Sequence, residues 1–197
     1  MYELAEADVH VWAVDLREPA PDALAQLSAE EIERAARFQF ERDRRRFVAA
    51  RAGLRRVLGA YLGCGAREIR FEAEAMGKPR TAGIEFNLSH SHELALVAVA
   101  GGTAVGVDVE YLRPQPDAVA IARRFFPPAE AAAVGEDPGV FFRVWTQREA
   151  WLKAEGAGLA GLGRERPAAW TVLDLEPAAG YVGAVAFQGA RRVLLKS

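Results

Sequence analysis

The stretch AVGVDVEYLRP, Ala104–Pro114, decides the fold class because it joins a strand pattern to a pair of carboxylates. Its valines alternate with small or acidic residues, in the order Val105, Gly106, Val107, Asp108, Val109 and Glu110. Successive side chains of a β-strand point to opposite faces, so we predict a valine face and a face that carries both carboxylates. Two interpretations of the pair stay open. The acids lie either on a solvated strand face or at a divalent cation, which prefers carboxylate oxygens and relieves their repulsion.

The composition favours a folded chain in a reducing compartment. The 197 residues are 51% hydrophobic and 26% charged, which suits a sizeable core in one domain or two small ones. The net charge of -2 favours neither nucleic acid nor an acidic surface as partner. The single cysteine, Cys64, rules out a disulfide framework within the chain and a cysteine-based zinc site. We therefore expect a cytoplasmic protein with no signal peptide, no membrane span and no nucleic-acid partner.

The order of the expected elements indicates an α+β fold in two halves. Apolar periodicity and turn residues predict strands over 8–16, 104–111, 170–176, 181–188 and 191–196, with several short strands within 69–102. The same signals predict helices over 27–38, 42–63, 118–126, 127–135 and 139–156. We expect an N-terminal half over 1–101 and a C-terminal half over 102–197.

The segment WTQREAWLKAEG, 145–156, places charged side chains on a helix that is also rich in aromatic residues. Trp145, Glu149 and Lys153 follow one another at intervals of four and so share a stripe. One interpretation is an exposed Glu–Lys pair worth roughly 0.3–0.5 kcal/mol. The other places the pair in a cleft, where Glu149 is a third cation ligand or a general base and Lys153 contacts a phosphate.

The segment FNLSHSHE, 86–93, offers polar side chains that suit phosphate binding. We expect His90 and His92 to share a strand face; a zinc site there is weakly supported because no third ligand is nearby. In a second interpretation the segment is a strand end in which Asn87 and Ser89 make local hydrogen bonds, and in a third Ser89 and His90 donate hydrogen bonds to a phosphate.

Basic residues elsewhere add further candidates. MGKPR, 76–80, is either a β-turn or a turn whose Lys78 contacts a nucleotide. Most arginines of 42–56 are expected on a solvated helix face, but Arg46 and Arg51 are candidates to clamp a phosphomonoester. The phosphate-loop pattern of kinases and NTPases is absent from the sequence, which excludes an enzyme of that type.

Taken together, the motifs resemble the 4′-phosphopantetheinyl transferase superfamily, Sfp type. That family has a G-[VI]-D-x-[ED] strand followed by W-[ST]-x-K-E-[AS]-x-x-K, and VGVDVE and WTQREAWLKAEGAGL match these in order and spacing. GKP, FNLSHS and the arginine-bearing helix also fall where the family has them, so the resemblance runs from about Arg37 to Leu159.

The resemblance implies two similar α+β halves related by a pseudo-two-fold axis, with coenzyme A in the cleft between them. The implied Mg²⁺ ligands are Asp108, Glu110 and Glu149. Glu149 and Lys153 are the implied catalytic residues, as general base and as pyrophosphate contact. The implied coenzyme A contacts are Arg46, Arg51, Lys78, Ser89, His90 and Lys153.

The implied reaction moves the phosphopantetheine arm of coenzyme A to a serine of an apo acyl or peptidyl carrier protein, and we expect a monomer to suffice. Arg148 departs from the family pattern, which has lysine there; arginine keeps the charge but does not give up a proton. A non-catalytic coenzyme A or carrier-protein binding module and another Mg²⁺-dependent phosphotransferase are the alternatives.

Overall fold

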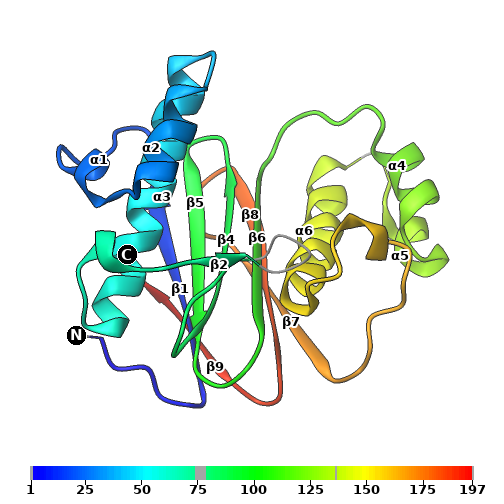
Figure 1. Cartoon of the computed structure of the whole chain (residues 1–197). Coiled ribbons are helices and arrows are strands. Elements are labelled where there is room, and N and C mark those ends of the chain that lie inside the picture. The colour runs from blue at the N-terminus through cyan, green and yellow to red at the C-terminus, as the bar shows by residue number, and fades with distance from the viewer. Residues whose placement is uncertain (1, 74–78, 136, 197) are drawn as a thin grey trace.

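The computed structural model describes residues 2–73, 79–135 and 137–196 and shows two larger β-sheets packed between helices, with a short two-stranded sheet beside them (Figure 1). This arrangement confirms the α+β class and the two-halves fold. Among the helices that the structure describes, none is long and apolar enough to cross a bilayer.

The N-terminal half supplies most of the first sheet and one long helix. Its strands are β1 (Asp8–Asp15), β2 (Glu72–Ala73), β3 (Pro79–Arg80), β4 (Glu85–Ser91) and β5 (Leu94–Ala100). Its helices are α1 (Ala23–Gln26), α2 (Ala29–Ala36) and α3 (Glu41–Leu62), followed by a 3₁₀ turn at Ala66–Glu68.

The C-terminal half begins with the strand that carries the two acids. Its strands are β6 (Val105–Tyr111), β7 (Trp170–Leu175), β8 (Tyr181–Gln188) and β9 (Arg192–Lys196). Its helices are α4 (Ala118–Phe125), α5 (Pro128–Ala133) and α6 (Pro138–Glu155), with a 3₁₀ turn at Leu159–Gly161. The strands and helices expected over these segments are confirmed, with ends that differ by a residue or two.

The sheet orders show where the two halves exchange a strand. The first sheet has the order β4-β5-β1-β9, and the second has the antiparallel order β6-β8-β7. Strand β9 pairs parallel with β1, and the Arg192 guanidinium donates to both Asp8 carboxylate oxygens at 3.0 and 2.9 Å. The last strand of the chain therefore belongs to the sheet of the N-terminal half, so a boundary at 101/102 leaves one strand crossing between the halves.

Local capping signals set the ends of the helices. The Ser28 hydroxyl accepts from the Glu31 amide while the Glu31 carboxylate accepts from the Ser28 amide, which is the expected capping box at α2. Helices α3 and α6 end at Gly63 and Gly156, with φ angles of 67° and 76° that favour glycine. These signals explain why the sequence located α2, α3 and α6, whereas the four-residue helix α1, which has no side-chain cap, was not predicted.

The main core lies between the two sheets. Strand β5 is buried along its whole length, since one face meets α3 and the other meets the second sheet. The valines of β6, Val105, Val107 and Val109, are at most 1% exposed and pack into this core. The predicted valine face is confirmed, and the opposite face of β6 is thereby turned toward α6.

Gly106 allows α6 to lie directly against β6. A Cβ atom at Gly106 would overlap the Ala150 carbonyl oxygen and the Ala154 amide nitrogen of α6. No other residue type fits this contact without moving the helix backbone. The glycine two residues before Asp108 therefore determines how closely the helix and the acidic strand face approach.

We predict that Gly106→Ala lowers the free energy of unfolding by about 1–3 kcal/mol or more, because the added methyl group meets helix backbone rather than a movable side chain. Urea unfolding followed by circular dichroism measures this. Gly135→Ala is the matched control, since a Cβ there meets nothing within 4 Å. Equal stability of the two variants would contradict the proposed contact.

Candidate active site

The site lies on the seam where edge strand β4 faces edge strand β6. Every second side chain of β4 is polar and reaches β6: Asn87, Ser89 and Ser91. The Val107 amide donates to the Asn87 Oδ1 atom at 2.9 Å, and the Tyr111 amide donates to the Ser91 hydroxyl at 3.1 Å. These side chains satisfy backbone groups that an edge strand otherwise leaves without a partner. The hydrogen bonds of Asn87 and Ser89, which were expected to be local, therefore join the two halves.

Asp108 is the buried centre of the site. The residue is 4% exposed, which excludes the interpretation of a solvated strand face. Its Oδ1 atom accepts from the Ser89 hydroxyl at 2.6 Å and from the Lys153 ammonium at 2.5 Å. Because Lys153 also donates to the Ser89 hydroxyl at 3.2 Å, these three side chains form one hydrogen-bonded cluster.

Helix α6 adds Glu149 to this cluster and β6 adds Glu110. The Glu149 carboxylate lies 3.9 Å from the Lys153 ammonium, one helical turn away. The Glu110 Oε2 atom accepts from the Ser91 hydroxyl at 2.7 Å and from the Arg113 guanidinium at 3.0 Å. The structure thus brings together Ser89, Asp108, Glu110, Glu149 and Lys153, all of which the sequence had singled out.

The pKa values of two carboxylates of the site, Asp108 and Glu149, are raised. Burial raises the pKa of Asp108, although the Lys153 ammonium and the Ser89 hydroxyl act in the opposite direction. Burial also raises the pKa of Glu149, and the charges of Asp108 and Glu110 add to this rise against the opposing effect of Lys153. The site therefore holds two acidic groups, Asp108 and Glu149, whose ionised forms burial disfavours although the Lys153 ammonium lies near both.

Two oxygen atoms of the site fit a cation. Asp108 Oδ2 and Glu149 Oε1 are buried and have no hydrogen-bond partner. Hard divalent ions prefer carboxylate oxygens, and Mg²⁺ commonly uses only one or two carboxylates from the protein. Within 2–73, 79–135 and 137–196, no three acidic, histidine or cysteine side chains already form a ligand set. At least one of the three acids must therefore move for all of them to bind one ion, and Ser91 and Arg113 hold Glu110 Oε2.

Arg46 and His90 adjoin this cluster. The Arg46 guanidinium lies 2.5 Å from a carboxylate oxygen of Glu93, in the turn between β4 and β5. Desolvation lowers the pKa of His90, followed by the nearby charge of Lys153, and Arg46 acts in the same direction. His90 thus lies near both Lys153 and Arg46, and these three side chains form a basic edge along the site.

Other expected contacts have different positions. The prediction that His90 and His92 share a strand face is wrong, because His92 lies in the turn after β4 with a φ of 50°. Arg51 donates to a Glu31 carboxylate oxygen at 2.5 Å and lies over the Phe71 ring, so the structure commits it to packing of α2 on α3. A phosphate contact by Arg51 stays a prediction. Lys78 lies outside the described residues.

Arg148 points away from the carboxylates. It is 3% exposed, donates to the Glu130 carboxylate of α5 at 2.6 Å and also donates to the Arg164 carbonyl oxygen. Its guanidinium lies 5.7 Å from the Trp151 ring centroid and 5.9 Å from that of Phe126. The positive charge that Arg148 keeps at the family's lysine position is therefore paired with Glu130, and the side chain clamps α5 and the loop after α6.

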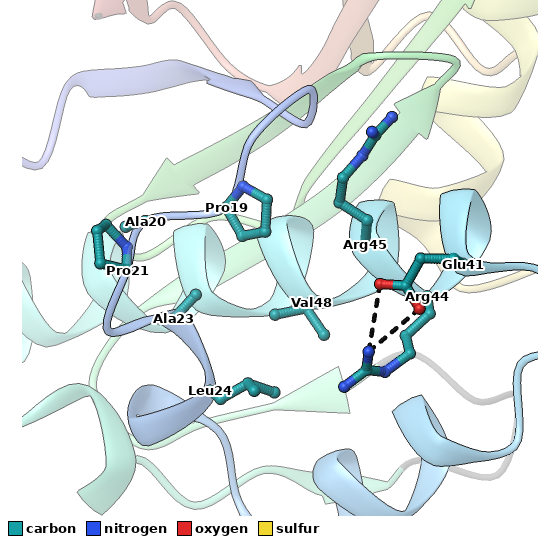
Figure 2. Close-up of a pocket in the computed structure, with 9 residues that line it drawn as sticks. All are labelled: Pro19, Ala20, Pro21, Ala23, Leu24, Glu41, Arg44, Arg45 and Val48. Carbon is teal, nitrogen blue, oxygen red and sulfur yellow. Dashed lines mark hydrogen bonds and ion pairs between the residues drawn. The ribbon is translucent and has the colours of Figure 1, made fainter.

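Two cavities of the molecule differ in their position relative to this site. Figure 2 shows a cavity of about 290 Å³ at the corner of α1 and α3, where Arg44 pairs with Glu41 away from the carboxylates. A second cavity of about 330 Å³ begins at Glu110 and Arg113 and continues between apolar side chains of α4 and α6. The second cavity, not the one in Figure 2, is continuous with the candidate site.

The comparisons with known proteins decide the family. A family model described as the 4′-phosphopantetheinyl transferase superfamily matches residues 104–191, and one described as the N-terminal part of such a transferase matches 15–102. The 4′-phosphopantetheinyl transferase HetI of Nostoc sp. is 41% identical over 94% of this chain and 90% of its own length. The chain belongs to the 4′-phosphopantetheinyl transferase superfamily.

Two further relatives agree with this membership. A putative 4′-phosphopantetheinyl transferase of Synechocystis sp. is 33% identical over 77% of this chain and 66% of its own length. The 4′-phosphopantetheinyl transferase Sfp of Bacillus subtilis is 29% identical over 68% of this chain and 62% of its own length. The resemblance read from the motifs is confirmed, and the chain is an enzyme of this superfamily.

Sequence reasoning missed three side chains that hold the superfamily motifs in place: Asn87, Ser91 and Arg113. Asn87 and Ser91 share the two-residue period of Ser89, so the alternation in FNLSHS was a usable signal for them. Arg113 offered a weaker signal: Glu110 lies only three residues before it, but its contact with the Phe142 ring forms only in the folded chain.

We predict that Arg148→Lys destabilises the fold by roughly 1–3 kcal/mol and Glu130→Gln by less, because Arg148 is buried and also bonds the Arg164 carbonyl oxygen, whereas the Glu130 side chain is 36% exposed. Urea unfolding of both single variants and the double variant measures this. A double variant no worse than Arg148→Lys alone is expected. Full stability of Glu130→Gln would contradict the clamp.

We also predict that Glu149→Gln raises the free energy of unfolding at pH 8 by about 1 kcal/mol, because it removes a buried charge that lacks a close partner. The raised pKa of Glu149 means that ionisation opposes folding. The gain should therefore be present above this pKa and vanish as the pH falls through it toward 4.5. Urea unfolding in a chelating buffer from pH 8 to pH 4.5 measures the difference, and a gain that is constant with pH would contradict it.

Proposed function

We propose that this enzyme transfers the 4′-phosphopantetheine arm of coenzyme A to a serine of an apo acyl or peptidyl carrier protein, with Mg²⁺ bound at the carboxylates. The observation that carries the proposal is the buried cluster of Asp108, Glu149 and Lys153 on the matched superfamily motifs. Membership of the superfamily supplies the reaction class, and the unpartnered oxygens support the cation.

The bond changes define what the residues must do. The serine hydroxyl oxygen attacks the β-phosphorus of coenzyme A, an O–P bond forms, and the bond to the bridging oxygen breaks to release 3′,5′-ADP. A divalent cation bound here would neutralise charge on the pyrophosphate oxygens. Asp108, Glu110 and Glu149 are the side chains that would hold it.

Glu149 is proposed to take the serine proton. Its Oε1 atom is the candidate for the cation, so the proton would go to Oε2, which lies 3.9 Å from the Lys153 ammonium. Burial raises the pKa of Glu149, so its carboxylate is more basic than an exposed one.

Lys153 is proposed to bind the pyrophosphate. Its side chain is 30% exposed, so it reaches both Asp108 and the open side of the site. A charged donor held in this way stabilises negative charge that develops on the leaving group. Arg46 and His90, on the adjoining basic edge, are proposed to contact the nucleotide phosphates.

One chain supplies every residue named in this mechanism, so we propose that a monomer is sufficient for activity. The composition offers no reason to propose a nucleic-acid partner. The carrier protein is proposed as a class, since acyl and peptidyl carriers present the same serine chemistry.

We predict that an apo carrier protein gains the mass of one phosphopantetheine arm when it is incubated with this enzyme, coenzyme A and Mg²⁺. EDTA should abolish the gain, and Glu149→Gln should slow it by about 10²–10⁴-fold, the range for loss of a general base. Intact-mass spectrometry of the carrier measures each rate.

Glu155→Gln is the matched control, because Glu155 is also on α6 but pairs with Arg164 outside the site. A gain of only a phosphate would indicate another phosphotransferase. Unmodified carriers of the fatty-acid, polyketide and nonribosomal-peptide types, together with measurable coenzyme A binding, would indicate a binding module instead.

A further inference from the structure

Arg113 lies at the edge of the carboxylate site. Its Nη1 atom donates to Glu110 Oε2 at 3.0 Å and to the Tyr111 carbonyl oxygen at 3.1 Å. Its guanidinium also lies 4.8 Å from the centroid of the Phe142 ring of α6. The side chain is therefore held in a defined position between β6 and α6, although it is 41% exposed.

Arg113 supplies the second positive charge of the site. Lys153 lies 2.5 Å from Asp108 and 3.9 Å from Glu149, while Arg113 is the basic partner of Glu110. Three carboxylates thus share two basic side chains, which hold Asp108 Oδ1 and Glu110 Oε2.

We propose that Arg113 competes with the divalent cation for Glu110 and so sets the affinity of the site for that cation. The inference rests on the proposed function, because it takes the carboxylates as the cation site. A cation that binds Glu110 needs lone pairs on its carboxylate oxygens and repels the guanidinium, so the Arg113–Glu110 pair must break or loosen as the cation binds.

The surroundings of Arg113 suit such an exchange. Glu110 keeps the Ser91 hydroxyl as a donor when the guanidinium leaves, so its carboxylate stays oriented toward the site. Arg113 keeps the Phe142 ring, which lines the neighbouring cavity together with Trp145. Arg113 is thus a positioning residue that acts on the cation through Glu110.

We predict that Arg113→Gln tightens Mn²⁺ binding about two- to fivefold, the effect expected when one partly exposed ion pair no longer competes. The experiment uses the full-length protein without coenzyme A and measures free Mn²⁺ by electron paramagnetic resonance, which does not depend on activity. Arg143→Gln is the matched control: Arg143 is 45% exposed, in the same half, and pairs with Asp174 at 3.1 Å. It should bind Mn²⁺ like the wild type.

Unchanged or weaker Mn²⁺ binding by Arg113→Gln would overturn the inference, as would equal tightening by Arg143→Gln, which would reveal an effect of net charge alone. Either result leaves the proposed function standing if the wild-type enzyme still modifies a carrier in a metal-dependent way. Absence of both Mn²⁺ binding and carrier modification in the wild-type enzyme would instead refute the proposed function.

Discussion

The direct contact between the backbones of α6 and β6 is the constraint on which the site depends. Gly106 permits this contact because any side chain there would meet the backbone at Ala150 and Ala154. At this short separation Lys153 reaches Asp108 across the interface. A strand face that carries acids and a helix face that carries an acid and a lysine thereby become one site.

The seam between β4 and β6 makes the same site rigid from the other side. Two edge strands meet there through side chains rather than through a shared backbone ladder, and Asn87 and Ser91 accept from the β6 amides. Ser89 joins this row and also holds Asp108. The hydrogen bonds that hold the two halves together are thus also the ones that orient the acidic residues.

This arrangement buries two carboxylates, Asp108 and Glu149, whose charges are only partly compensated within the folded chain. Burial raises the pKa values of Asp108 and Glu149, and one oxygen of each carboxylate has no hydrogen-bond partner. Groups of this kind weaken a fold, and they are typical of positions where binding or catalysis provides the missing partner. Two arginines, by contrast, have their charges paired within the fold: Arg51 bonds Glu31 and Arg148 bonds Glu130, and both stabilise helix packing.

The sequence by itself determined the α+β class, the main helices and the alternation that gives β6 one valine face and one acidic face. It also identified Asp108, Glu149 and Lys153, since periodicity and capping are local properties and the motifs keep their spacing along the chain. Only the tertiary structure decided that β9 joins the first sheet, that Arg148 turns toward α5 and that Arg113 lies over the Phe142 ring of α6. These outcomes depend on residues brought together by sheet pairing and helix packing. A charged side chain has several partners of similar chemistry available, and the folded geometry selects among them.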